Sequence, residues 1–551
     1  MVKKTKSGEL GFTFRLFSAG FVIMFYLAAV LYVHFIGKNK DALGPAVNTI
    51  TLAHWQLEDG YREGFNEMIR RFEALKAKQG RKVKVLQTAV PWRGYEQWFL
   101  TQLVGGNPAD VAELLAPDYM LQEYFNPLSE YIEKENPFNK GTVLEGMAWR
   151  DTFVDGMDAS ANLTAKYADY FGVGTCFHVY RLFANLDLIE EATGSRKMPQ
   201  DLPEWLDICK KVKEYGKKTG QRIIPIGVRG FDKSTIDHFF EYYFGQVTGN
   251  LNDNDARFCE GRAEVDEILK KINDNPAVAE QLLVPVCIVK ELGQYFCDGF
   301  SSMDLEQNKY LFYSGNTAFF AEGTWNAYSL VKNCPFEVGI GRIPPIGHKS
   351  KYSKYFTGKV SESGVGVGGF FGIPKATKHF DLALELLQFM TSYEMNQLTM
   401  GSCKWPPAVK KAKFEGILKS FEPEIEGNLR MLDLPFRTKL RYSSDIKMCE
   451  ALEEVIISDV DNPGEYFMKR FREYKDLLIK ECNEDEQFHY RSNIDRELQR
   501  SQIAVALLRE NLSEKQIKTL HKRIRVIAES YQDAIKTYVI YHNYLSQIKN
   551  M

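Results

Sequence analysis

Strand-like and helix-like segments alternate along the chain from residue 49, and this alternation most constrains its fold. Apolar stretches and amphipathic stretches follow one another as predicted strands and helices at 49–54, 60–77, 82–90, 95–104 and 110–115. Residues 203–249 continue the pattern, with a helix from Pro203 to about Gly216, a strand at 223–228 and a helix capped by Ser234. Because strands that alternate with helices form sheets flanked by helices, the sequence predicts an α/β fold with largely parallel strands.

The segment 16–36 is apolar and carries no formal charge. An α-helix of about 20 residues spans the roughly 30 Å hydrocarbon core of a bilayer. More cations precede the segment than follow it, namely Lys3, Lys4, Lys6 and Arg15 against Lys38 and Lys40. This excess predicts a single-pass transmembrane anchor whose N-terminal end stays in the cytoplasm. A cleaved signal peptide is the alternative, although its apolar region is usually shorter and residues 35–38 form a poor cleavage site. A lipid anchor is excluded, since the first cysteine is Cys176.

The last part of the chain has a different pattern. From Ile517 to Ile548 the apolar positions alternate between spacings of three and four, and a weaker run of the same kind covers 494–512. This spacing is typical of a coiled-coil seam. The sequence therefore predicts two long helices, which either fold together as a hairpin or engage a helical partner.

No catalytic or metal-binding motif stands out. The formal net charge of −2 at pH 7 gives no reason to expect nucleic acid as a partner. HExxH, GxSxG, Walker A and EF-hand patterns are absent, and the nine cysteines lack CxxC spacing, although Cys287 and Cys297 could pair. Gly364, Gly366 and Gly369 match GxGxxG, but an extended run closed by proline follows them instead of a helix. We therefore predict no catalytic residue, no metal site and no cofactor.

Tryptophan placement is more informative. Trp55 follows the first predicted strand, and Trp92 follows the second. Ligands of open α/β sheets bind beyond the carboxyl ends of the strands. An aromatic face can stack on the apolar side of a sugar ring while polar neighbours bond its hydroxyl groups. Ordinary packing is the alternative for any one tryptophan, and Trp98 and Trp205 lie within helix patterns that favour packing, whereas Trp149 has no assignment.

Several sequence blocks occur in a characteristic order. They include ITLAHWQ at 50–56, GYEQWFLTQLVGGNPADV at 94–111, NPLSEYI at 126–132, PEW at 203–205, FFAEGTW at 319–325 and GIPK at 372–375, the last followed by ALELLQFMTS at 383–392. Together they resemble the extracellular solute-binding proteins of bacterial ABC importers, the sugar-binding group similar to maltose-binding protein. The resemblance covers 49 to about 480, but Gly174 stands where the family commonly has proline.

The resemblance implies a two-lobed, periplasmic-binding-protein-like α/β fold with a ligand site between the lobes, hinged at crossing segments. Carried over position by position, it implies the ligand-binding residues Trp55, Glu58, Trp92, Arg93, Glu113, Glu322, Trp325, Gly369, Phe370 and Trp405. Trp55 and Glu58 would lie on the first-strand loop, and Trp92 and Arg93 on the second-strand loop.

The expected protein is a membrane-anchored binding protein, not an enzyme, that captures a sugar or oligosaccharide. It would deliver this ligand to ABC permease subunits that work with a cytoplasmic ATPase. We expect it in the bacterial inner membrane, with the binding domain in the periplasm or outside the cell. The predicted domains are 1–48 for the stub, anchor and linker, 49–480 for the solute-binding domain and 481–551 for the helical extension. The alternative is a ligand-binding sensor or assembly module that signals through its C-terminal helices without transport.

Overall fold

The computed structural model describes residues 48–115, 118–154, 156–157, 163–164, 169–230, 233–249, 275–362, 367–424, 426–428 and 442–481, and the isolated positions 501, 505 and 517. The predicted anchor and nearly all of the predicted C-terminal helices lie outside these ranges. Among the helices within them, none combines the length and the apolar character needed to cross a bilayer.

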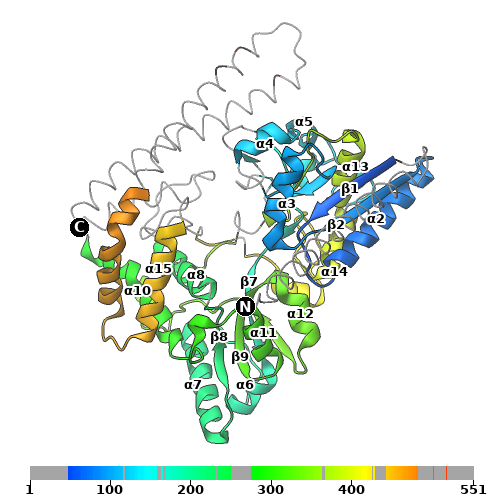
Figure 1. Ribbon diagram of the computed structural model, residues 1–551. Helices are drawn as coiled ribbons and strands as arrows, with labels where there is room; N and C mark the ends of the chain where they lie inside the picture. The colour runs from blue at the N-terminus through cyan, green and yellow to red at the C-terminus, as the bar shows by residue number, and fades with distance from the viewer. Residues whose placement is uncertain are drawn as a thin grey trace, which may run out of the picture.

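The first lobe is built on a four-stranded sheet in the order β12-β3-β1-β2, at the upper right of Figure 1. β1 (Asn48–His54) pairs in parallel with β2 (Val83–Ala89) and β3 (Val111–Glu113), which confirms the three strands predicted here. β12 (Phe371–Gly372) joins β3 in the antiparallel direction from far along the chain. The helices of this lobe are α2 (Tyr61–Lys78), α3 (Trp92–Val104), α4 (Asp118–Tyr124), α5 (Ser129–Ile132), α13 (Phe380–Met390) and α14 (Tyr393–Cys403).

Helix α2 shows why this lobe forms where the sequence predicts it. Its apolar residues recur at helical spacing, and Phe65, Met68 and Phe72 are fully buried against the sheet. Helix α3 begins at Trp92, three residues earlier than predicted, because Pro91 already occupies its N-cap position. Trp92 and Arg93 therefore lie in the first helical turn, and their predicted place on a loop is wrong.

The second lobe contains a sheet in the order β10-β7-β9-β8. Its strands are β7 (Tyr180–Asn185), β8 (Ile224–Gly227), β9 (Thr317–Gly323) and β10 (Val338–Gly341). β8 and β9 are parallel, but β7 runs antiparallel to both β9 and β10, so the prediction of a largely parallel sheet is wrong for this lobe. β7 enters the lobe directly from the crossing segment, whereas a helix precedes each of the other three strands. The covering helices are α6 (Leu186–Thr193), α7 (Leu202–Thr219), α11 (Leu305–Tyr313) and α12 (Ala327–Asn333).

A group of helices packs beside the second lobe, at the lower left of Figure 1. They are α8 (Ser234–Thr248), α10 (Pro276–Gly293), α15 (Tyr442–Ile457) and the helical residues 463–481. Ser234 is the first helical residue of α8 and Lys233 is its N-cap, so Ser234 does not cap this helix as predicted. Phe240, Phe467 and Leu478 are buried in one core with the strands of the second lobe.

Within the described residues the chain crosses between the lobes three times, and the third crossing leads from α14 in the first lobe to the residues 416–421 that pack in the second lobe. In the first, β6 (Cys176–Phe177) precedes β7; in the second, β11 (Val367–Gly368) precedes β12, and the two short strands pair antiparallel. The two-lobed α/β fold predicted from the sequence is therefore confirmed. The remaining short elements are β4 (Leu163–Thr164), β5 (Asp169–Tyr170) and the 3₁₀ turns η1 (Pro137–Asn139), η2 (Trp149–Thr152), η3 (Phe300–Ser302), η4 (Thr324–Asn326), η5 (Ser353–Tyr355) and η6 (Gly416–Phe421).

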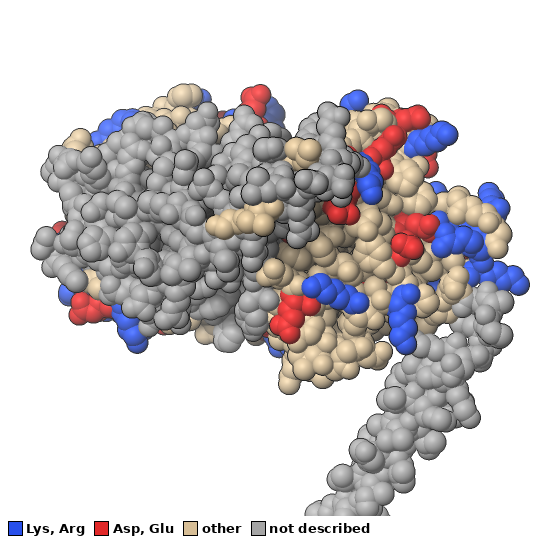
Figure 2. All heavy atoms as spheres, turned by 90° about the horizontal axis from the view of Figure 1, so that it is seen from above, with Lys and Arg blue, Asp and Glu red and all other residues tan. Residues whose placement is uncertain are grey.

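Most of the described cysteines are buried in the interior of the fold. Cys287 and Cys297 are both free, so the suggested pairing between them is wrong. Trp149 and Trp205 are fully buried, and the Trp149 indole donates a hydrogen bond to Thr391 Oγ1 at 3.0 Å. Seen from above, basic and acidic side chains are interspersed over the described surface (Figure 2).

Gly60 fixes the start of α2 against α14. Its φ is +82°, and a Cβ atom placed there would lie 2.3 Å from the Ser402 carbonyl oxygen. Gly80 has a similar φ of +76° but no atom near that position. We expect Gly80→Ala to cost about 1 kcal/mol, and Gly60→Ala at least about 2 kcal/mol more because backbone must also move. Urea unfolding of both variants measures this difference, and equal costs would contradict the close packing.

Candidate functional site

An aromatic cluster lies at the carboxyl ends of the first-lobe strands. Trp55 follows β1, and its ring centroid is 5.2 Å from that of Trp92 and 5.1 Å from that of Tyr95, both in edge-to-face contact. Trp92 is 56% exposed and Trp55 is half-buried, whereas Tyr95 is fully buried. The fold thus brings two predicted site residues together with part of their rings open to solvent. Arg93, the next residue of α3, is also exposed.

The loop that bears Trp55 is held by Glu113 at the end of β3. Gln56 Nε2 donates a hydrogen bond to Glu113 Oε1 at 2.6 Å, and the Trp55 backbone N–H donates to Oε2 at 3.3 Å. Tyr95 donates its hydroxyl proton to the Glu113 carbonyl oxygen at 2.7 Å. Glu113 itself is fully buried, and this burial raises the pKa of its carboxyl to about 8. Glu58, on the same loop, also has a raised pKa because of its burial.

The raised pKa of Glu113 predicts a pH dependence of stability. The folded-state pKa of about 8 lies above the ordinary value of 4.5, so the folded chain retains a proton that the unfolded chain releases between these pH values. The resulting stabilisation is complete below about pH 4.5 and is lost as the pH rises through 8. We expect Glu113→Gln to remove this component, which has a limiting slope of about 1.4 kcal/mol per pH unit.

The measurement is urea unfolding of wild type and Glu113→Gln across this pH range. Glu123→Gln, at an exposed glutamate of α4, is the matched control and should keep the wild-type slope. Identical slopes for wild type and Glu113→Gln would show that the buried carboxyl does not retain its proton.

A second group of predicted residues lies in the second lobe, beside the first crossing. Glu322 is fully buried on β9, where its Oε2 lies 3.5 Å from Arg229 Nη1 and its Oε1 accepts a hydrogen bond from Gly323 N at 2.8 Å. Trp325, in η4, is half-buried. Its ring lies 5.5 Å from that of His178 and 6.5 Å from that of Tyr180. Burial lowers the pKa of His178 to about 4, so its ring is neutral at pH 7.

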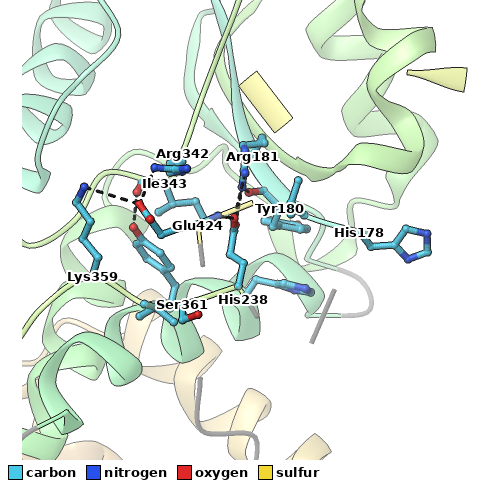
Figure 3. A pocket seen from close by; sticks show the side chains of 13 residues that line it. His178, Tyr180, Arg181, His238, Arg342, Ile343, Lys359, Ser361 and Glu424 are labelled. Carbon is cyan, nitrogen blue, oxygen red and sulfur yellow. Dashed lines mark hydrogen bonds and ion pairs between the residues drawn. The ribbon is translucent and has the colours of Figure 1, made fainter. Parts of the chain in front are cut away.

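A pocket opens beside these residues in the second lobe (Figure 3). Its lining residues are His178, Val179, Tyr180, Arg181, His238, Tyr242, Arg342, Ile343, Lys359, Val360, Ser361, Glu362 and Glu424. Tyr180 and His238 form one wall as a stacked pair, with ring centroids 4.1 Å apart and planes 12° from parallel. Sequence reasoning missed this pocket, because its residues come from separate segments and share no motif.

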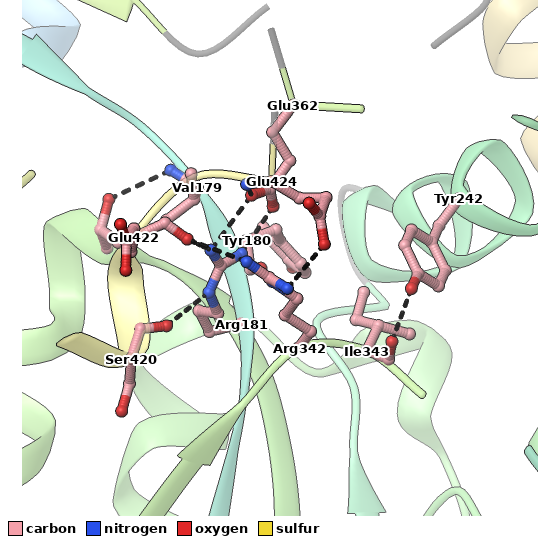
Figure 4. Close-up of polar contacts among 11 residues, drawn as sticks. Val179, Tyr180, Arg181, Tyr242, Arg342, Ile343, Glu362, Ser420, Glu422 and Glu424 are labelled. Atoms are coloured by element: carbon pink, nitrogen blue, oxygen red, sulfur yellow. Dashed lines mark hydrogen bonds and ion pairs between the residues drawn. The ribbon is translucent and has the colours of Figure 1, made fainter. Parts of the chain in front are cut away.

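Arg181 holds the loops of this pocket together (Figure 4). It is fully buried at the start of β7, and each of its five N–H donors has an acceptor. Nη1 and Nη2 contact the two carboxylate oxygens of Glu362 at 2.6 and 3.1 Å. The other acceptors are the carbonyl oxygens of Tyr180, Ser420 and Glu422, at 2.8, 2.8 and 3.0 Å.

Comparison with known proteins identifies the family of this two-lobed chain. The family described as bacterial extracellular solute-binding protein matches residues 56–397, more than half of the sequence. The chain belongs to this family. The resemblance stated from the sequence is confirmed, and so, at the level of the family, is the expectation of a binding protein rather than an enzyme. No curated protein matches the sequence.

Solved structures share the fold of this solute-binding protein at low identity. The GacH receptor of Streptomyces glaucescens is 17% identical, with 78% of this chain and 98% of that chain covered and a TM-score of 0.52. The apo form of RafE from Streptococcus pneumoniae is 18% identical, with 78% and 98% covered and a TM-score of 0.52. Maltose-bound MalE3 of T. maritima is 16% identical, with 79% and 100% covered and a TM-score of 0.52.

Not every predicted site residue of this solute-binding protein is accessible. Trp405, which the resemblance implies as a ligand-binding residue, is 1% exposed and packs against the rings of Tyr61 and His178, at 5.1 and 5.2 Å, so its ring is not open to a ligand. Lys404, at a φ of +61°, ends α14 and turns the chain inward. Gly369 is buried in the second crossing, while Phe370 is half-buried and its carbonyl oxygen accepts a hydrogen bond from Leu114 N at 2.7 Å.

A hydrogen bond at Gly369 joins the two antiparallel crossings. Gly369 has a φ of +60°, and its carbonyl oxygen accepts a hydrogen bond from Thr175 Oγ1 at 3.1 Å. Gly364 and Gly366, the other members of the glycine pattern, lie outside the described residues. Within the described part of the chain, no group of three or more His, Cys, Asp or Glu side chains could hold a metal ion.

Proposed function

We propose that this solute-binding protein captures a sugar or oligosaccharide between its two lobes and delivers it to an ABC importer. The observation that carries the proposal is the presence of partly exposed aromatic rings on both lobes. Trp55 and Trp92 supply them on the first lobe, and Trp325 supplies one on the second. Such rings offer flat apolar faces for a pyranose ring, while neighbouring polar groups bond its hydroxyls.

The family and the similar structures support this choice of ligand. The GacH receptor was solved in complex with acarbose, and MalE3 of T. maritima was solved with maltose bound. Lobe closure follows from the same geometry, because a ligand that contacts both lobes stabilises the conformation in which they approach each other. The two antiparallel crossings are the elements about which such a hinge would turn.

The proposal includes a membrane tether and a position outside the cytoplasm. Its support is the apolar segment 16–36 with the excess of cations before it, together with the extracellular character of the family. A tether would keep the receptor at a high effective concentration near ABC permease subunits. It would place the binding domain on the outer side of a bacterial inner membrane.

A thermal-shift screen of the purified full-length protein tests the proposed ligand class. The screen uses neutral and acidic mono- and oligosaccharides, with amino acids and short peptides as non-saccharide controls. A saccharide present at about 100 times its Kd should stabilise the folded state by about 2.7 kcal/mol, which raises the unfolding temperature measurably. If no saccharide shifts the transition, or if only a control solute does, the proposed function is wrong.

A further inference from the structure

The second-lobe pocket holds more positive than negative charge at its open rim. Among its lining residues, Arg181 and Glu362 neutralise each other, since both Glu362 carboxylate oxygens accept hydrogen bonds from Arg181. Glu362 Oε2 also accepts a bond from the Glu424 backbone N–H at 2.7 Å. This pair, of which Arg181 is buried and Glu362 is 25% exposed, therefore fixes one wall of the pocket and has no donor left for a ligand.

Among the described residues that line the rim, three charged side chains remain, those of Arg342, Lys359 and Glu424. The Glu424 carboxylate is shared by Arg342, whose Nη1 donates to Oε2 at 2.7 Å, and by Lys359, whose Nζ lies 3.8 Å from the same oxygen. Two cations thus face one anion, which leaves one uncompensated positive charge. The side chains of Arg342 and Lys359 are 44% and 64% exposed, so both are open to a ligand.

These two cations also have unused hydrogen-bond donors. Among the described residues, Arg342 donates only to Glu424 and, at 3.3 Å, to the Glu422 carbonyl oxygen, so three of its five N–H groups have no acceptor. The distance from Lys359 Nζ to Glu424 exceeds that of a hydrogen bond, so its three donors are also unused. Such a set of donors matches the oxygens of a carboxylate or sulfate.

Apolar and aromatic side chains line part of the same pocket. The stacked rings of Tyr180 and His238 lie on the side away from Lys359 (Figure 3), and Val360 and Ile343 also line the pocket. The enclosed part of the pocket has a volume of about 90 Å³. This is smaller than the roughly 300–1,000 Å³ of a site that encloses a whole small molecule, so the pocket has room for one substituent of a larger ligand.

We infer that this pocket binds an anionic substituent of the captured saccharide, the carboxylate of a uronic acid or a sulfate ester, through Arg342 and Lys359. The inference rests on the proposed function and narrows its substrate class to acidic saccharides. Glu424 lowers the affinity of the pocket for an anion, because its carboxylate competes with the ligand anion for both cations.

Calorimetric titration of the full-length protein with matched ligand pairs tests this inference. The pairs are galacturonate, glucuronate and mannuronate oligomers against their methyl esters, and sulfated galactose oligomers against their desulfated forms. We expect the anionic member of the recognised pair to bind about tenfold or more tightly, with an affinity that falls as NaCl is raised. The uronate and sulfate arms show which anion is recognised.

Three variants make the test specific to the pocket. Lys359→Gln should weaken binding of the anionic member about tenfold, and Glu424→Gln should tighten it, while binding of the neutral member stays unchanged. Lys354→Gln is the matched control, since Lys354 is 66% exposed and pairs only with Glu280, at 3.4 Å, among the described acidic residues. It should change neither affinity.

The outcomes separate this inference from the proposed function. If a neutral saccharide binds as tightly as its anionic counterpart, and Lys359→Gln changes nothing, the inference is overturned while saccharide capture stands. If no member of any pair binds and no other saccharide does, both the inference and the proposed function are wrong.

Discussion

Arg181→Met is expected to lower the free energy of unfolding by about 3–5 kcal/mol. The guanidinium is fully buried and donates five hydrogen bonds to Glu362 and to three backbone carbonyl oxygens. Methionine fills much of the same volume but leaves the Glu362 carboxylate without its counter-ion. The removal of Arg181 costs more than the pair contributes, because the Glu362 carboxylate, whose side chain is only 25% exposed, is left partly hydrated and without its counter-ion.

The matched control for this substitution is Arg196→Met. Arg196 also contacts several carboxylates, those of Asp187, Glu190 and Glu337, but its side chain is 45% exposed. Solvent screens these pairs, so the control should cost about 1 kcal/mol or less. Urea unfolding followed by tryptophan fluorescence compares the two variants. Similar small losses for both would mean that Arg181 does not hold the 359–362 and 416–424 segments on β7.

Trp92→Leu is expected to weaken saccharide binding by about tenfold to a hundredfold, whereas Trp92→Phe should keep most of the affinity. Both replacements are apolar, but only phenylalanine retains a flat ring that can stack on a sugar. Trp92 is 56% exposed in the first turn of α3, so neither change should remove much buried surface or unfold the lobe. The comparison therefore separates stacking from simple apolar contact.

The affinity of each Trp92 variant is measured by fluorescence or calorimetric titration with a saccharide from the thermal-shift screen. Trp98→Phe serves as the control, because Trp98 lies on the same helix and is half-buried against Tyr95. It should bind like wild type. Equal affinities of Trp92→Leu and Trp92→Phe would show that Trp92 does not stack on the ligand, even if the saccharide binds.

Local sequence patterns were sufficient for the first lobe. The apolar residues of β1 and the helical spacing of Phe65, Met68 and Phe72 in α2 are properties of short segments, and each predicted element formed within a few residues of its expected place. The direction of β7 could not be obtained in this way, because strand direction in a sheet depends on the route by which the chain enters the lobe.

The residues of the candidate site were likewise predictable only where local sequence patterns place them. The proximity of Trp55 and Trp92 follows from their positions after neighbouring strands, because parallel strands bring their carboxyl ends together. The burial of Trp405 was not predictable, because the left-handed residue Lys404 that turns it inward is neither glycine nor asparagine. The burial of Arg181 could not be predicted from its neighbours in the sequence, because its acceptor Glu362 lies far along the chain.

Calorimetry on the full-length protein can show whether the saccharide is captured between the two lobes. The experiment compares the Kd of one saccharide for wild type, Trp55→Ala, Trp325→Ala and the double variant. Trp55 packs in the first lobe, whereas Trp325 lies directly after strand β9 of the second lobe and also packs against the first-lobe core. If the saccharide is held between the lobes, each single substitution should weaken binding by about tenfold or more, and the double variant should show no measurable binding. Wild-type affinity in either single variant would contradict capture between the two lobes.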